Sequence, residues 1–166
     1  MPSPQQRPPR GYIDPRGQRF AATLTTIVLA VVLLTGSGWL LLAQALVFAI
    51  GAADITKAPY GLLFRSLIRP RIGPPRELEA AAPPRFAQLV GLVFAAVGTV
   101  GYLAGAPLLG TVMTAFALAA AFLNAAFGVC LGCEAHLLIM RAISRPTGPR
   151  YLTPTQEAAP AATQAP

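Results

Sequence analysis

The stretch that decides the fold is "FAQLVGLVFAAVGTVGYLAGAPLLGTVMTAFALAAAFLNAAFGVCLGC", residues 86–133, which contains no Asp, Glu, Lys or Arg. One helix needs about 20 apolar residues to cross the hydrocarbon core of a bilayer. The 48 residues of this stretch are therefore too many for one span and suit two. Glycines and a proline in "GYLAGAP", residues 101–107, mark the point where the chain turns back. Helices are the expected form, because backbone that faces lipid must satisfy its hydrogen bonds within its own segment.

Residues 20–53 form a second charge-free stretch, of 34 residues, with a turn at "TGSGW", residues 35–39. The whole chain is 54% hydrophobic and only 11% charged, whereas soluble domains carry about 25% charged residues. We therefore predict an all-α integral membrane protein with four transmembrane helices in two helical hairpins, at about residues 20–36, 38–54, 86–104 and 108–129. A soluble helical core is disfavoured because these helices lack polar faces. A cleaved signal peptide is the alternative for the first stretch, but that stretch runs straight into a second span.

The basic residues predict the orientation. Of the 13 Lys and Arg, four precede the first span, six lie between the second and third spans, and three follow the fourth. None lies in either hairpin turn. The positive-inside rule then places both termini and the central loop in the cytoplasm, with the spans in the plasma (inner) membrane. The formal charge of +7 follows from this topology, and we expect no nucleic-acid binding because no motif supports it.

The two ends of the chain differ in composition from the rest. Residues 1–10 and 146–166 are rich in Pro and in small or polar residues, and they offer no apolar face. We predict a flexible N-terminal tail, a membrane domain over residues 11–145 and a disordered C-terminal tail. Asp14 and Pro15 fit the N-cap and first position of the first helix, with a simple juxtamembrane turn as the alternative.

The central loop contains "PYGLLFRSLIRPRIG", residues 59–73, in which apolar residues recur at helical spacing. Arginines on the adjacent strip would meet anionic headgroups, so we predict a short interfacial helix here. Ordinary juxtamembrane charge and a partner-docking surface are the alternatives. The proline-rich residues 69–85 are expected to be extended or rich in turns.

Both cysteines and the only histidine lie in "NAAFGVCLGCEAHLLIMR", residues 124–141. The fourth span should end close to Cys130 and Cys133 on the cytoplasmic side, with a break at Gly128 and a second interfacial helix after it. Two cysteines at this spacing can close a disulfide when the first lies in the first turn of a helix. A helix N-terminus also lowers the pKa of a thiol and favours the reactive thiolate. Because the cytoplasm is reducing, we predict reversible chemistry for the pair.

We predict the catalytic residues to be Cys130, as the attacking thiol, and Cys133, as the resolving thiol. Glu134 would accept a proton, and His136 could assist from the flanking face. Two alternatives stay open: the cysteines could be packing residues, or they could bind zinc with Glu134 and His136, although four ligands are hard to assemble on one helix. A c-type haem is excluded because Glu134 stands where its histidine would be. We expect no metal and no cofactor.

Four motifs resemble an uncharacterised family of small bacterial integral membrane proteins, known as a domain of unknown function. They are "DPRGQRFAA" (residues 14–22), "PYGLLFR" (59–65), "PPRFAQLVGLVF" (83–94) and "FLNAAFGVCLGCE" (122–134). The resemblance covers roughly residues 12–143 and brings no catalytic assignment. Members are often encoded beside rhodanese-type sulfurtransferases and thioredoxin-like proteins, which implies a place in sulfur transfer or thiol redox.

The predicted function is thus thiol–disulfide exchange or sulfane-sulfur transfer at the membrane edge. The predicted partners are the lipid bilayer and a thioredoxin-like or rhodanese-like cytoplasmic protein, and the oligomeric state stays open. One alternative is a permease or channel subunit for a small sulfur compound, whose path Gln44, Gln88 and Asn124 would line. Hydrogen bonding between helices is the more usual role of such residues. The other alternative is a non-catalytic membrane scaffold.

Overall fold

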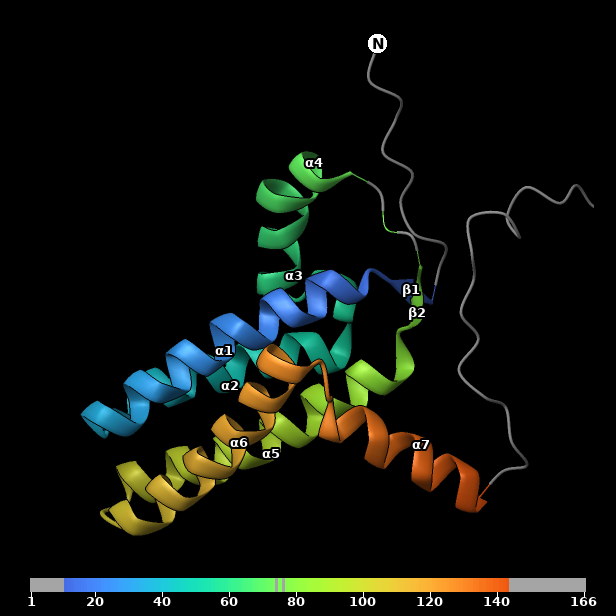
Figure 1. The fold of residues 1–166 in the computed structure, drawn as a ribbon. Coiled ribbons are helices and arrows are strands. Elements are labelled where there is room, and N and C mark those ends of the chain that lie inside the picture. Colours follow the sequence, from blue (N-terminus) through green and yellow to red (C-terminus); the bar gives the residue numbers. More distant parts are fainter. Residues whose placement is uncertain (1–10, 74, 76, 144–166) are drawn as a thin grey trace, which may run out of the picture.

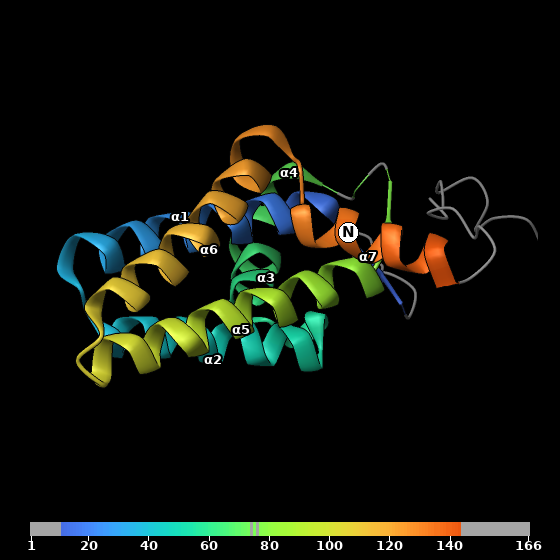
Figure 2. The same ribbon diagram turned by 90° about the horizontal axis from the view of Figure 1, so that it is seen from below.

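Four long helices lie side by side in the computed structural model, which describes residues 11–73, 75 and 77–143 (Figure 1). They are α1 (Pro15–Thr35), α2 (Gly38–Ala53), α5 (Ala82–Leu103) and α6 (Pro107–Phe127). Figure 2 shows them from below, with α7 (Leu131–Ile143) leaving the bundle at one end. The helical fold class is therefore confirmed, while the two predicted tails, residues 1–10 and 146–166, lie outside the described residues.

Three of these helices, α1, α5 and α6, are long and apolar enough to cross a membrane. Their outer surfaces carry large apolar side chains, such as Leu34 and Phe116, which suit contact with lipid. α2 is equally apolar but has only 16 residues. At 1.5 Å per residue it is roughly 24 Å long, and the hydrocarbon core is about 30 Å thick. Length and composition therefore give three membrane-spanning helices, and α2 falls short of the same requirement.

The four helices pack as a ring. α2 contacts α5 extensively, α1 contacts α6 and α5 contacts α6, whereas α1 and α2 touch little. The close approaches depend on glycine: a Cβ on Gly98 would lie 2.9 Å from a methyl group of Leu41, and one on Gly101 would lie 2.7 Å from the backbone nitrogen of Gly110. Small residues at such crossings let membrane helices pack closely, since lipid tails supply no hydrophobic force between them. The buried core of the ring is Leu29, Val32, Leu41, Ala45, Phe48, Ala95 and Ala117.

Several polar groups inside the ring find partners nearby, whereas the Nε2 of Gln44 has no hydrogen-bond partner among the described residues. Thr99 donates to the carbonyl of Ala95 at 2.7 Å and Thr114 to that of Gly110 at 2.8 Å. Gln44 is fully buried, and its Oε1 accepts a hydrogen bond of 2.8 Å from the hydroxyl of Tyr60. The predicted role of Gln44 in bonding between helices is confirmed by this contact.

Of the two alternatives for the start of α1, the structure shows the N-cap. Asp14 is its N-cap, with Oδ1 accepting from the backbone N–H of Arg16 at 3.0 Å, and Pro15 is the first helical residue. Just before it, β1 (Tyr12–Ile13) pairs antiparallel with β2 (Glu79–Ala80). This short ladder fixes the start of α1 beside the segment that leads into α5.

The central segment is helical over α3 (Pro59–Leu63), the π-helical η2 (Phe64–Ile68) and α4 (Arg69–Ile72). A short 3-10 turn, η1 (Ile55–Lys57), joins it to α2. Phe64 anchors the segment on α1, with its ring centroid 5.8 Å from that of Phe20. Leu63 and Leu67 remain exposed. The predicted helix therefore exists, and it is docked through Phe64 and through the hydrogen bond of Tyr60 to Gln44.

The expectation of extended chain from residue 69 onward is wrong for Arg69–Ile72. Pro70 lies in the first turn of α4. A helix leaves its first N–H groups without intrahelical partners, so proline is tolerated at that position.

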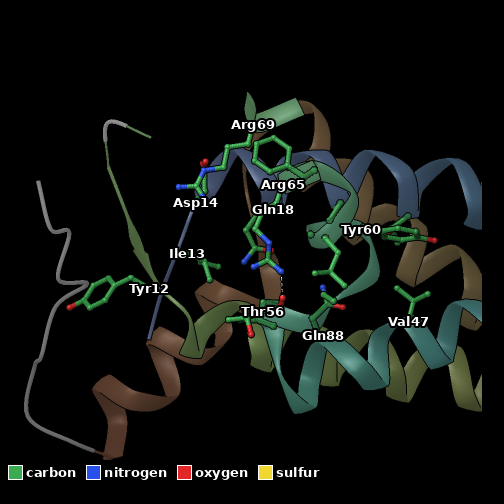
Figure 3. A pocket seen from close by; sticks show the side chains of 18 of the residues that line it. Tyr12, Ile13, Asp14, Gln18, Val47, Thr56, Tyr60, Arg65, Arg69 and Gln88 are labelled. Atoms are coloured by element: carbon green, nitrogen blue, oxygen red, sulfur yellow. Dashed lines mark hydrogen bonds between the residues drawn. The ribbon is translucent and has the colours of Figure 1, made fainter. Parts of the chain in front are cut away.

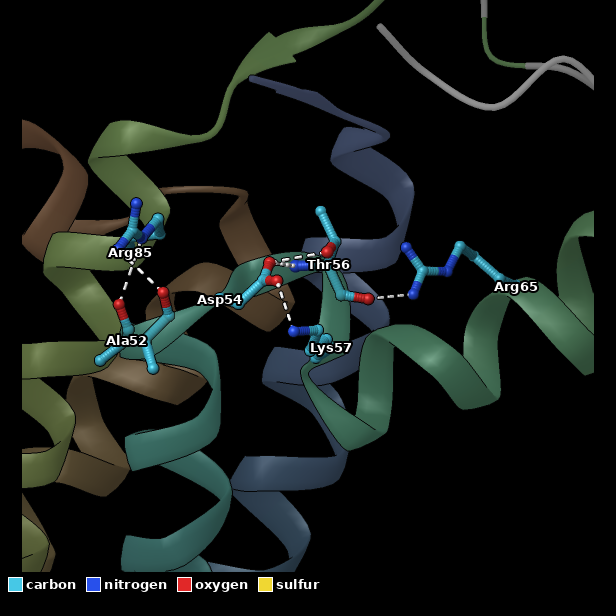
Figure 4. Close-up of polar contacts among 7 residues, drawn as sticks. Ala52, Asp54, Thr56, Lys57, Arg65 and Arg85 are labelled. Carbon is cyan, nitrogen blue, oxygen red and sulfur yellow. Dashed lines mark hydrogen bonds and ion pairs between the residues drawn. The ribbon is translucent and has the colours of Figure 1, made fainter. Parts of the chain in front are cut away.

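Arg85 ties the two halves of the ring together (Figure 4). Its Nε donates to the carbonyl of Ala52 at 3.1 Å and its Nη2 to that of Ala53 at 2.9 Å. A cation at the last carbonyls of α2 satisfies orphaned acceptors and complements the helix dipole. Beside it, Asp54 caps η1: its Oδ1 accepts from the backbone N–H of Thr56 at 2.9 Å and from the hydroxyl at 2.6 Å. These hydrogen bonds from Thr56 are the main cause that lowers the pKa of Asp54, and Lys57 adds to it.

Candidate dithiol site

The dithiol site begins where α6 ends. Gly128 adopts a left-handed conformation with φ of 72°, and its N–H donates to the carbonyl of Asn124 at 3.0 Å. The next residue, Val129, donates to the carbonyl of Leu123 at 3.4 Å. Glycine takes this backbone conformation without steric cost, so it is the usual residue after a helix C-terminus. The predicted break at Gly128 is confirmed, and it turns the chain out of the bundle.

Cys130 is the residue on which α7 starts. Its carbonyl accepts from the N–H of Glu134 at 2.9 Å, and its Sγ accepts from the N–H of Cys133 at 3.3 Å. The first sulfur of the pair thus occupies the place of an N-cap side chain, at the positive end of the helix dipole. The Cα atoms of Cys130 and Cys133 are 5.1 Å apart, and their sulfurs are joined as a disulfide. Both side chains are half-buried.

Gly132, inside the pair, lies against α5. A Cβ on Gly132 would lie 2.6 Å from both Cα and Cβ of Ala87, which real Cβ atoms essentially never do. Only glycine lets the first turn of α7 approach α5 so closely, and α7 makes most of its contacts with α5. The dithiol is therefore held by backbone packing of one helix start on another.

Glu134 and His136 differ in their surroundings. Glu134 is exposed in the first turn of α7. His136 is half-buried, with its ring centroid 5.5 Å from that of Phe86 on α5. Its Nδ1 is buried and has no hydrogen-bond partner among the described residues. Residues three apart on a helix are neighbours, so His136 lies on the same side of α7 as Cys133.

Arg19 brings a positive charge close to the site. Its Nη2 donates to the carbonyl of Ala125 at 3.4 Å, and its Nε lies 4.0 Å from the position that a Cβ on Gly128 would take. From the sequence, Arg19 counted only toward membrane topology, and no pattern indicated that Phe86 or Ala87 would lie at this site. The glycine between the cysteines was the only signal of close packing, and nothing in the sequence named the helix that would pack there.

The structure gives no support to a metal centre at this place. Among residues 11–73, 75 and 77–143, no group of three or more His, Cys, Asp and Glu side chains is arranged to hold a metal ion. Cys130 and Cys133 are bonded to each other, and the ring of His136 packs on Phe86.

Comparison with known proteins places the chain at the level of a family. No curated protein and no solved structure matches it. A family model does match, over residues 13–141, and it bears out the resemblance to a domain of unknown function. That match covers more than half of the chain, and it takes in the four long helices, the central segment and both cysteines. The chain therefore belongs to the DUF4395 family, a domain of unknown function.

Proposed function

We propose that this protein is a four-span protein of the plasma (inner) membrane that performs thiol–disulfide exchange or sulfane-sulfur transfer at its cytoplasmic edge. The observation that carries the proposal is the position of Cys130, whose Sγ accepts from the N–H of Cys133 at the N-terminus of α7. A thiolate at that position is stabilised by the N–H and by the helix dipole, which lowers the pKa of a thiol.

The proposed orientation is supported by where the bundle carries its polar elements. One end of the bundle holds the start of α1, the central segment, the start of α5 and α7 (Figure 1). The other end holds the α1–α2 and α5–α6 turns, which carry no Lys or Arg. The described Lys and Arg residues belong to the first end. The positive-inside rule makes that end cytoplasmic. α2 would complete the fourth span, because a bilayer thins locally around a helix a few Å too short at a modest cost.

In the proposed exchange, the Cys130–Cys133 disulfide accepts two electrons from a thioredoxin-like partner. A partner thiolate attacks Cys130 Sγ, the intramolecular S–S bond breaks, and Cys133 leaves as a thiolate. The partner's second thiol then attacks the mixed disulfide, and the partner departs oxidised. In the reverse direction Cys130 attacks a partner disulfide, Cys133 resolves the mixed disulfide, and Glu134 accepts the proton of Cys133. His136, three residues beyond Cys133, would assist in that proton transfer through its unbonded Nδ1.

Sulfane-sulfur transfer would use the same two thiols. The Cys130 thiolate takes the outer sulfur from the persulfide of a rhodanese-like partner, which leaves as a thiolate. Cys133 then attacks Cys130 Sγ, so the disulfide closes and the outer sulfur leaves as hydrosulfide. Both reactions require the pair to be reachable from the cytoplasm, and this shared requirement is the one to test first.

The test is labelling with a membrane-impermeant maleimide in intact cells and in inverted membrane vesicles, each before and after reduction with a phosphine. The expected result is labelling only in inverted vesicles, rising by up to two labels per chain after reduction. Cys130→Ser and Cys133→Ser variants serve as matched controls and should take one label without reduction. Absence of label from both sides would overturn the proposal and favour packing cysteines in a scaffold. Label from the outside only would reverse the orientation.

The permease alternative finds less support in the bundle. Its path would need water-accessible polar groups along the bundle, whereas Gln44 is only 1% exposed. The Oε1 of Gln44 accepts from Tyr60, and its buried Nε2 has no hydrogen-bond partner among the described residues. Uptake of thiosulfate into proteoliposomes that hold the purified protein, without thiol exchange, would nevertheless replace the dithiol proposal by that one.

A further inference from the structure

A cavity of about 490 Å³ lies at the end of the bundle where α1 and α5 begin (Figure 3). Its walls come from α1, α2, the central segment, the start of α5 and β1. Cavities of 300–1,000 Å³ are the usual size of sites for organic ligands. Neither cysteine lines it, so the dithiol chemistry does not account for it.

The charges around this cavity are unequal. Two guanidinium groups line it, those of Arg65 and Arg69, and a single carboxylate, that of Asp14. Asp14 is already ion-paired with Arg16, whose Nη2 lies 3.1 Å from Oδ2. Arg65 donates to the carbonyl of Thr56 and points across the cavity toward it (Figure 3). The lining therefore favours a negatively charged ligand.

Neutral donors add to the polar side of the cavity. The Nε2 of Gln18 is buried and has no hydrogen-bond partner among the described residues. A buried amide N–H without a partner destabilises the folded state. An acceptor in the cavity would remove this destabilisation, and the oxygens of an oxyanion are such acceptors.

The cavity changes character along the bundle. Asp14 and Arg69 stand at one end of it, and Val47 and Tyr60 lie toward the interior of the bundle (Figure 3). On α1 the lining runs from Asp14 to Thr25, which is about three turns or roughly 16 Å. Ala21, Val47 and Leu62 supply apolar lining. A ligand that fills the cavity thus has a charged end near the membrane surface and an apolar body within the bundle.

We propose that this cavity binds an anionic amphiphile, a phosphate ester whose oxyanion is held by Arg65, Arg69 and Gln18 while its apolar part lies along α1 and α2. The phosphate could belong to an anionic lipid or to a soluble phosphate ester. Both carry the same phosphate group. A competition experiment between the lipid and a soluble ester therefore distinguishes the two ligands. The site is independent of the dithiol proposal.

The test is native mass spectrometry of the full chain released from nanodiscs that contain equal amounts of phosphatidylglycerol and phosphatidylcholine. The wild-type protein should retain phosphatidylglycerol in preference. Arg65→Gln should lower that retention about tenfold, as expected for the loss of a charge-assisted hydrogen bond. The matched control is Arg71→Gln, because Arg71 also donates to a nearby carbonyl, that of Leu67, but does not line the cavity. It removes the same charge and should change retention less than twofold.

A second variant, Gln18→Leu, replaces the unbonded amide by an apolar group of similar size and should also weaken retention without lowering the melting temperature. Equal retention of both lipids by the wild-type protein would overturn the proposal, and so would equal losses for Arg65→Gln and Arg71→Gln. Glycerol 3-phosphate is then added as a soluble competitor for the bound lipid. If it displaces the lipid at millimolar concentration, the head alone is recognised and a soluble ester is the ligand. If it does not, the apolar part is required and the ligand is the lipid.

Discussion

Two junctions of the chain have almost the same backbone design and different side chains. At the first, α1 ends on Gly36, with φ of 64°, and Ser37 caps α2 by accepting from the N–H of Leu40 at 3.3 Å. At the second, α6 ends on Gly128, with φ of 72°, and Cys130 caps α7 by accepting from the N–H of Cys133 at 3.3 Å. The first junction returns the chain along the bundle, and the second sends it out.

The two capping residues, Ser37 and Cys130, differ in how well their side chains accept a hydrogen bond. Serine is among the preferred N-caps, because its oxygen is a good acceptor for the free N–H groups of the first turn. Sulfur is a weaker acceptor, and Cys130 is the only N-cap among the described residues that bonds its helix through sulfur. Asp14, Ser37 and Asp54 all use oxygen. Capping alone therefore explains Ser37 and leaves Cys130 to be explained by its reaction with Cys133.

The largest expected effect, on the rate of thiol exchange, comes from giving the second junction the serine cap of the first. Cys130→Ser should abolish thiol exchange completely while α7 keeps its cap and its place on α5. Cys130→Ala should also abolish exchange and should in addition cost about 1 kcal/mol of stability through the lost cap. Rates of exchange with reduced thioredoxin and melting temperatures in detergent measure the two effects. Exchange at the wild-type rate in Cys130→Ser would contradict the assigned role.

The next effect concerns the glycines. Gly132→Ala should destabilise by about 1–3 kcal/mol, because its Cβ would press on the backbone of Ala87 and α7 would have to move. Gly36→Ala is the matched control: a Cβ there meets nothing within 4 Å, so only the left-handed backbone is strained, at about 1 kcal/mol. Thermal unfolding gives the difference. Faster proteolysis after Arg141 should appear in Gly132→Ala alone, and its absence would mean that α7 is not held by this contact.

A smaller effect tests sulfur against oxygen directly. Ser37→Ala should cost about 1 kcal/mol, as for other lost N-caps. Ser37→Cys should fall between the wild type and Ser37→Ala, since sulfur accepts the Leu40 N–H less well. Unfolding in detergent by both heat and denaturant measures the series. A Ser37→Cys variant as stable as the wild type would remove the argument that Cys130 is a poor structural choice.

The smallest effect is the pH dependence of the third oxygen cap, Asp54. Hydrogen bonds from Thr56 lower its pKa below the ordinary 3.8, so the carboxylate stabilises the folded state above that value. This contribution is lost as the pH falls through the lowered pKa. Asp54→Asn keeps the cap and removes the titration. The stability of the wild type relative to Asp54→Asn should therefore decline below about pH 4, and parallel curves from pH 7 to pH 3 would refute the linkage.

Local signals predicted the helix ends well. Charge-free length, the Asp14–Pro15 pair and Gly128 are each local features of the sequence, and each marks a boundary that the structure bears out within a few residues. The prediction for α2 was weaker because its 16 residues are too few to establish a span. The helical start of residues 69–85 was missed since proline was counted as a breaker, although it is tolerated in a first turn.

Contacts between distant segments could not be predicted. The thiol pair and its glycine are visible in the sequence, but Ala87, Phe86 and Arg19 join the site only through the packing of α7 on α5 and of α1 on α6. The cavity is hidden for the same reason, because Gln18, Arg65 and Gln88 come from three separated segments. Charge and hydropathy patterns do not indicate which helices pack against each other.

The packing of α1 against α6 has a consequence for how the protein is made. A ribosome delivers α1 first and α6 last of the four, so α1 waits in the membrane without its main neighbour until residue 127 has been added. During that interval Leu29 and Val32 have only part of the contacts that bury them in the finished ring. A chain truncated before α6 leaves this face open for as long as it exists. α1 therefore gains its main packing partner only when α6 is complete.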